Sequence, residues 1–261
     1  MRNLIPVIIF LFILVIPTLS QITPKKHQAL PTNDLWMEDY IEKSTSGQEM
    51  FDKVIDAGHA IYKPLADENE ESLRINKNWE DPTVNANASR WYGSVTINMY
   101  GGLFRRPETT IEGFALVLCH ELGHAYGGEP YIRVWSKLSA EGQADFIGSK
   151  ECLHRIMASL NLKNYEEHAT GFMKDTCAEK FEEPARQDLC VRSLIGGQSL
   201  GNLLATISEV VIPDYETPDP TIVEETLLTY PDTVQCRLDT YLQGTLQQDR
   251  PACWFKKEVT E

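Results

Sequence analysis

Apolar residues recur every three or four positions over residues 111–126, which predicts an amphipathic helix. The buried stripe of this helix consists of Ile111, Ala115, Leu118, Leu122 and Ala125. Thr109 and Glu112 have the spacing of a capping box at its start, and Gly127-Gly128 supplies a stop. Two histidines of this stretch fall outside the stripe. The pattern therefore predicts a half-buried helix with a second face that carries polar chemistry.

The same reading predicts the neighbouring elements. Helical spacing covers residues 49–65, and alternation of apolar and polar residues predicts strands over 72–79 and 90–100. Ser139 is expected to cap a helix that runs to about residue 160. Further helices are expected over 189–211, 222–228 and 234–242, with a charged, broken helical stretch over 161–187 and a loop over 213–220. This order predicts an α+β fold, mostly helical, with a small mixed sheet next to the helix at 111–126.

The chain of 261 residues is expected to contain one main domain. Residues 1–20 have the short apolar core and small-residue end of a secretory signal peptide, with an uncleaved anchor as the alternative. Residues 21–47 are predicted to be a loose lead. A single domain then spans 48–261, with a cysteine-containing helical excursion around 161–211. No later stretch is apolar for long enough to span a bilayer, so we expect an exported protein without a stable span after cleavage.

The net charge argues against one class of partner. It is −14 for the full chain, and removal of residues 1–20 takes away Arg2 and no acid, which makes it −15. Such an acidic protein is not expected to bind nucleic acid.

All six cysteines lie after the predicted signal peptide, and an even number in an exported chain indicates disulfides. Cys177–Cys190 and Cys236–Cys253 are the closures that sequence proximity favours. Cys119 precedes a histidine of the candidate site, and it is expected to be either a disulfide partner or a buried thiol.

The candidate chemistry lies in His120-Glu121-Leu122-Gly123-His124. Residues four apart share a face of a helix, so His120 and His124 can bind one metal ion together, with Glu121 beside it as general base. Glu141 can supply a third ligand, which predicts one Zn²⁺ per chain with an open position for water. Asp145, one turn further on, is placed to accept the other N–H of a ligating imidazole. A lone motif of this kind can arise by chance on a charged helix, but the added acidic pair favours a metal site.

Four segments in order resemble the gluzincin metallopeptidases of the CaaX prenyl endopeptidase and HtpX type. The segments are Val84-Asn85-Ala86-Asn87-Ala88, Gly102-Leu103, the zinc helix from Leu116 to His124, and Glu141-Gly142-Gln143-Ala144-Asp145. The resemblance covers about residues 54–245 and implies a zincin-like fold. The short gap between His124 and Glu141 leaves no room for the membrane hairpin of integral-membrane relatives.

One family position differs. The family typically has Thr-His-Pro before its last helix, whereas this chain has Thr229-Tyr230-Pro231. The phenol of Tyr230 can also donate a hydrogen bond to an oxyanion, and we treat it as a candidate catalytic residue. Arg237 is a second candidate for that role, or else a salt-bridge residue.

The predicted function is that of a zinc metalloendopeptidase, in which a zinc-activated water attacks a peptide bond and Glu121 is the general base. The substrate is expected to be a peptide or protein that adds to the edge of the strand at 90–100. A non-catalytic, zinc-stabilised binding or chaperone-like protein is the first alternative. A zinc amidase or aminopeptidase with a small substrate is the second. The oligomeric state is left open.

Overall fold

The structure is a computed structural model that describes residues 27–35, 45–162 and 165–257. The predicted signal peptide lies outside these residues. So does most of the segment 21–47 that was expected to be loose.

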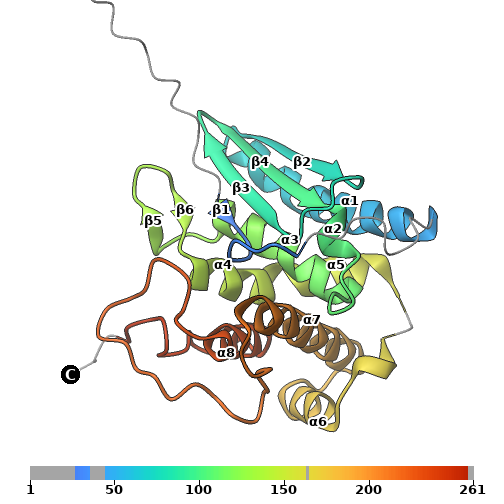
Figure 1. Ribbon diagram of the computed structural model, residues 1–261, viewed down its shortest axis with the longest axis vertical. Coiled ribbons are helices and arrows are strands. Elements are labelled where there is room, and N and C mark those ends of the chain that lie inside the picture. Colours follow the sequence, from blue (N-terminus) through green and yellow to red (C-terminus); the bar gives the residue numbers. More distant parts are fainter. Residues whose placement is uncertain (1–26, 36–44, 163–164, 258–261) are drawn as a thin grey trace, which may run out of the picture.

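A four-stranded mixed sheet forms one layer of the molecule, in the order β1-β3-β4-β2 (Figure 1). Its strands are β1 (His27–Gln28), β2 (Ser72–Asn78), β3 (Ala86–Trp91) and β4 (Ser94–Tyr100). β2 runs parallel to β4, whereas β3 pairs antiparallel with both β4 and β1. A separate two-stranded ribbon consists of β5 (Tyr131–Arg133) and β6 (Leu138–Ser139).

Helices form the rest of the framework. They are α1 (Thr45–Glu68), α2 (Gly101–Phe104), α3 (Ile111–Tyr126), α4 (Glu141–Ile147), α5 (Leu153–Leu160), α6 (Gly171–Lys180), α7 (Pro184–Ser208) and α8 (Val234–Thr245). A π-helical segment, Gly148–Cys152, joins α4 to α5, and a 3₁₀ turn, Glu166–His168, precedes α6. The predicted α+β class with a small mixed sheet is confirmed at this level.

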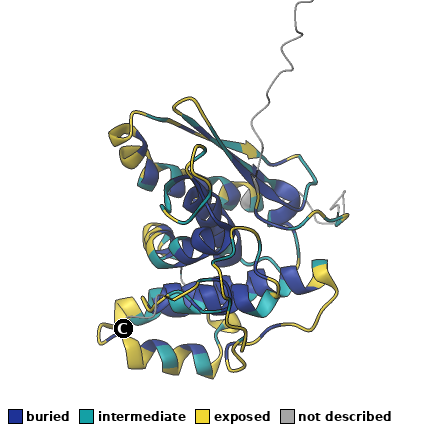
Figure 2. Ribbon diagram, turned by 90° about the vertical axis from the view of Figure 1, so that its left-hand side faces the viewer, coloured by how far each residue is buried: buried dark blue, intermediate teal, exposed yellow. Residues whose placement is uncertain are grey.

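Helix α3 has the predicted bounds but not the predicted exposure. The sheet covers one side of it, while α1, α4 and α7 pack around the others (Figure 1). Every residue from Glu112 to Ala125 is buried, within the dark-blue centre of Figure 2. The expectation of a half-buried helix was therefore wrong, because the face that carries the histidines contacts other elements instead of solvent.

The strand predicted over residues 90–100 is in fact two strands. Tyr92 and Gly93 both have positive φ (43° and 72°) and turn the chain back between β3 and β4. The predicted alternation holds within β4, where Val95, Ile97 and Met99 are buried. Because β4 is paired on both sides, it is a central strand, and its expected role as a peptide-binding edge was wrong.

Three local predictions also needed correction. Thr110, not Thr109, caps α3, because it directly precedes the first helical residue and its side chain accepts a hydrogen bond from Gly113 N. Ser139 lies in β6, and α4 begins after Ala140 without a side-chain cap. Residues 222–228 are irregular rather than helical, since the amides of this stretch bind the C-terminal segment, as in Val223 N→Ala252 O and Leu227 N→Trp254 O.

The N-terminal segment departs most from expectation. Its residues 27–30 are not loose: β1 pairs with β3, and Ala29 and Leu30 are 1% and 0% exposed. Main-chain pairing and the burial of Leu30 in the core explain this order.

Three disulfides form among the described residues: Cys119–Cys152, Cys177–Cys190 and Cys236–Cys253. The two predicted closures are confirmed. Cys119 is not a thiol but ties α3 to the π-helical segment. Such cysteine use is typical of proteins that mature in an oxidising compartment.

In the part of the chain that the structure describes, no helix is both long and apolar enough to cross a membrane.

A buried ion pair joins α3 to α7. Arg192, 1% exposed, donates from Nε and Nη2 to Glu112 Oε1 at 3.2 and 3.0 Å.

Arg192→Met should lower the free energy of unfolding in urea by about 3–5 kcal/mol, because it leaves the Glu112 carboxylate buried without its cation. The exposed pair Lys63–Asp67 is the control, and Lys63→Met should cost less than about 1 kcal/mol. Equal losses in the two variants would contradict this account.

Candidate metal centre

The two histidines of α3 present one nitrogen each toward a common point. His120 Nδ1 lies 2.6 Å from Asp145 Oδ1, and His124 Nδ1 lies 2.8 Å from the carbonyl oxygen of Ser139. An acceptor at Nδ1 holds the proton there and leaves Nε2 as an electron-pair donor. Both rings are fully buried, with centroids 4.6 Å apart. Their orientations are thus set by neighbours outside the candidate site.

Glu141 completes the group from the first turn of α4. Its Oε2 lies 3.3 Å from His120 Nε2 and 3.5 Å from His124 Nε2. Ligand atoms about 2.0–2.2 Å from a tetrahedral zinc ion are themselves about 3.3–3.6 Å apart, so these spacings fit such an ion. The three buried residues can therefore hold a metal ion. Imidazole and carboxylate donors suit Zn²⁺ among other transition-metal ions.

Close backbone contact between α3 and α4 brings these groups together. A Cβ on Gly123 would lie 2.7 Å from Ala144 O and 3.0 Å from Ala144 Cα. A Cβ on Gly148 would lie 3.1 Å from the backbone nitrogen of His120. The disulfide from Cys119 fastens the same crossing. The glycine in the His-Glu-Leu-Gly-His motif is thus required for the approach that places Glu141 and Asp145 beside the histidines.

Asp145 connects the histidine to α8. Its Oδ1 accepts hydrogen bonds from Arg237 Nη2 at 2.7 Å and from the Tyr241 hydroxyl at 3.0 Å, and its Oδ2 accepts one from Arg237 Nε at 2.7 Å. Burial would raise the pKa of Asp145, but Arg237 and then His120 outweigh it and lower that pKa. Burial likewise lowers the pKa of His120, and the Asp145 carboxylate reverses this and raises it to about 10. The site thus favours a cation at His120, either a proton or a metal ion that replaces it.

Glu121 lies beside the three ligands and is 0% exposed. Neither of its carboxylate oxygens has a hydrogen bond of normal geometry within the described residues. Burial raises the pKa of Glu121 to about 8, while His120, Arg237 and the nearby backbone amide of Ala29 act in the opposite direction. Glu121 therefore has the environment of a carboxyl group that can exchange a proton near neutral pH.

Tyr230 and Arg237 lie next to each other beside this group, and Arg237 is buried. The Arg237 guanidinium lies 5.4 Å from the centre of the Tyr230 ring. Burial, and after it the negative charge of Glu141, raises the pKa of the Tyr230 hydroxyl. The phenol is therefore a neutral donor, and its hydroxyl donates to the carbonyl of Gln28. Arg237 uses two nitrogens for Asp145 and a third, Nη1, for the carbonyl of Ala29 at 3.2 Å. Its geometry is that of the salt-bridge residue, the second of the two predicted roles.

The sequence reading missed two contributors. Tyr241 is four residues after Arg237 on α8, so helical spacing contained the signal for it. Residues 28–30 carry no recognisable pattern, and only the structure places them over the site.

No protein family, curated protein or solved structure matches this chain. The resemblance to the CaaX and HtpX type of metallopeptidase therefore rests on the four motifs alone.

Asp145→Asn should weaken zinc affinity about 10–100-fold, because the ring of His120 loses the carboxylate that orients it. Affinity is measured by competition with a chelator, on protein shown to be folded by circular dichroism. Tyr241→Phe is the matched control, since it removes one neutral hydrogen bond to Asp145 and leaves both charged partners in place. Unchanged affinity in a folded Asp145→Asn protein would show that this carboxylate does not orient the ligand.

Proposed function

We propose that this protein is a zinc-dependent metalloendopeptidase with Glu121 as its general base. One observation carries the proposal: the Nε2 atoms of His120 and His124 meet Glu141 Oε2 at ligand spacing, with an additional buried carboxylate beside them. A structural zinc site closes its coordination with four protein side chains, whereas three protein donors are typical of catalytic sites. Among the described residues, the group contains three.

A zinc ion held by His120, His124 and Glu141 would supply Lewis acidity, polarising a carbonyl and activating water. Glu121 then accepts a proton and later passes it to the leaving amine. The position of Glu121 suits both steps, since it is buried beside the ligands and neither of its carboxylate oxygens is held by a hydrogen bond of normal geometry within the described residues.

The hydroxyl of Tyr230 supplies a neutral donor to a peptide carbonyl. It already makes such a bond, to the main chain of Gln28. A substrate carbonyl in a comparable position would receive the same hydrogen bond as charge develops on its oxygen. The proposed substrate is accordingly a peptide or protein, and the six disulfide-bonded cysteines favour an exported site of action.

The complete burial of the group favours a second candidate. His120, Glu121 and His124 are 0% exposed and Glu141 is 3% exposed, as in a site that stabilises a fold without turning over substrate. A non-catalytic, zinc-stabilised binding protein is therefore the alternative.

Glu121→Gln separates the two. The purified exported protein should contain about one zinc per chain by elemental analysis, and this variant should keep the zinc but lose nearly all cleavage of a peptide library, because an amide cannot accept the proton. His120→Ala is the control and should lose both. Wild-type protein without bound metal after zinc supplementation would refute the proposal. Zinc-loaded protein that cleaves no peptide, even when residues 28–30 are displaced from the site, would favour the binding protein.

Tyr230→Phe tests the phenol. If its hydroxyl stabilises the oxyanion, the variant should show kcat lowered by about 10²–10³-fold, with zinc content unchanged and a smaller effect on KM. Steady-state kinetics at saturating substrate give the value. An unchanged kcat would show that the Tyr230 hydroxyl does not act in catalysis and only binds the main chain of Gln28.

A further inference from the structure

Residues 28–30 pass beside the candidate site, with Gln28 as the last residue of β1 and Ala29 and Leu30 directly after it. In Figure 1, β1 at the start of this segment runs beside β3. Gln28 lies opposite Asn87 in the antiparallel register, and Ala29 N donates to Ala86 O at 3.1 Å. The Ala29 backbone is also among the groups that face Glu121. The segment thus covers the catalytic carboxylate from the side of the sheet edge.

Side chains from three other places hold the main chain of this segment. Asn85 accepts from Leu30 N and donates to Leu30 O, both at 3.1 Å. Arg237 donates to the carbonyl of Ala29 at 3.2 Å, and the Tyr230 hydroxyl donates to the carbonyl of Gln28. Three consecutive residues are therefore bound through their peptide groups.

Recognition through main-chain groups accepts many sequences, and specificity then comes from pockets for alternate side chains. Here Gln28 is exposed, whereas Leu30 is completely buried in the core. Peptide added antiparallel to a sheet edge, with one apolar side chain inserted, is a common mode of peptide binding. The contacts of residues 28–30 are those of a bound peptide ligand.

We propose that the edge of β3, with Asn85, Tyr230 and Arg237, is the groove that takes an extended peptide, and that residues 28–30 occupy it as an intramolecular inhibitor. This inference rests on the proposed function and names its substrate-binding site. The groove prefers an apolar side chain at the position of Leu30.

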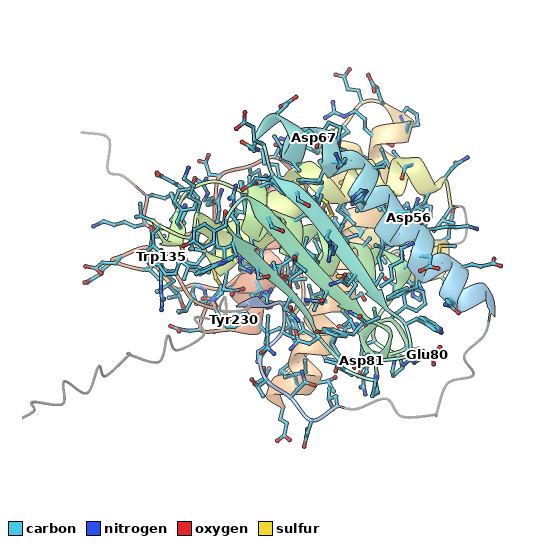
Figure 3. The ribbon with its side chains drawn as sticks, turned by 90° about the horizontal axis from the view of Figure 1, so that it is seen from above. Asp56, Asp67, Glu80, Asp81, Trp135 and Tyr230 are labelled. Carbon is cyan, nitrogen blue, oxygen red and sulfur yellow. A yellow bond between two sulfur atoms is a disulfide. The ribbon has the colours of Figure 1, made fainter. Side chains whose placement is uncertain are left out.

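The register also gives the direction of a longer peptide. Residues that precede His27 in an equivalent strand would run along Ser89–Trp91, since His27 lies opposite Ala88. That path leads toward a cavity of about 560 Å³, whose lining includes Arg90, Trp91, Tyr92 and Trp135. Figure 3 shows Trp135 and Tyr230 on the same side of the sheet, away from Asp56 on α1. The part of a substrate that precedes the bound residues would meet this aromatic cavity.

The test uses the full exported chain loaded with zinc, in a Glu121→Gln background that prevents cleavage. Leu30→Ala removes the buried anchor, and Ala29→Pro removes the N–H that pairs with Ala86. The control is Leu73→Ala, a buried leucine of β2 on the opposite edge of the sheet. The probe is a fluorescent synthetic peptide with the sequence of residues 25–35, and its binding is measured by anisotropy.

Both segment variants should bind the probe at least about 10-fold more tightly than the control, because the groove is vacated and the leucine of the probe can fill it. With Glu121 restored, they should also cleave a peptide library faster than the control. Binding no tighter than in Leu73→Ala, in variants that are folded by circular dichroism, would overturn the inference. Tight binding without cleavage in any variant would support the groove and refute the peptidase proposal.

Hydrogen exchange on the unsubstituted chain gives a measurement that does not depend on variant folding. Saturating probe should accelerate exchange of the amides of Ala29 and Leu30, since the probe displaces the segment. Unchanged exchange at those amides with the probe bound would overturn the inference.

Discussion

The Asp145 carboxylate bonds at once to the ring of His120 on α3 and to the guanidinium of Arg237 on α8. A carboxylate buried this deeply is stable only when it is paired and fully hydrogen-bonded, so α4 cannot pack here without both partners. The same bonds aim His120 Nε2 at Glu141. The geometry of the candidate metal ligands therefore depends on how α8 docks, and the Cys236–Cys253 disulfide beside Arg237 supports that docking.

The residues of the candidate metal site could be predicted from local spacing because they lie on two helices. His120 and His124 share a helical face, and Glu141 and Asp145 share another, so each pair needs only the 3.6-residue period. The bounds of α3 followed from the same period. The contacts that join the pairs could not be predicted, because they depend on tertiary packing. Cys119 reaches Cys152 only because Gly123 and Gly148 allow the helices to cross closely. Nothing in the sequence around either cysteine identifies the other as its partner.

The contacts of the N-terminal segment were even harder to predict from the sequence. Asn85 binds Leu30 across 55 residues of chain, and Arg237 binds Ala29 across 208. A two-residue strand has too few side chains to produce a periodic signal, so the polar composition of its surroundings predicted a loop. The hairpin at Tyr92-Gly93 was missed for a different reason: the clear alternation of residues 95–100 was extended back over the turn, where both residues have positive φ.

The burial of the site and its proposed activity are compatible if a substrate strand takes the place of residues 28–30, instead of these residues moving away and leaving the site empty. Removal of residues 28–30 alone would leave the Tyr230 hydroxyl and Arg237 Nη1 without the carbonyls of Gln28 and Ala29, and the loss is costly for the buried guanidinium of Arg237. A substrate strand that presents two carbonyls at the same positions replaces both hydrogen bonds, so most of that cost does not arise. The donors that now hold the segment would thus select for an extended peptide as its replacement. Because Arg237 also pairs with Asp145, the same exchange would act on the residue that orients His120, and occupancy of the groove would be coupled to the metal ligand itself.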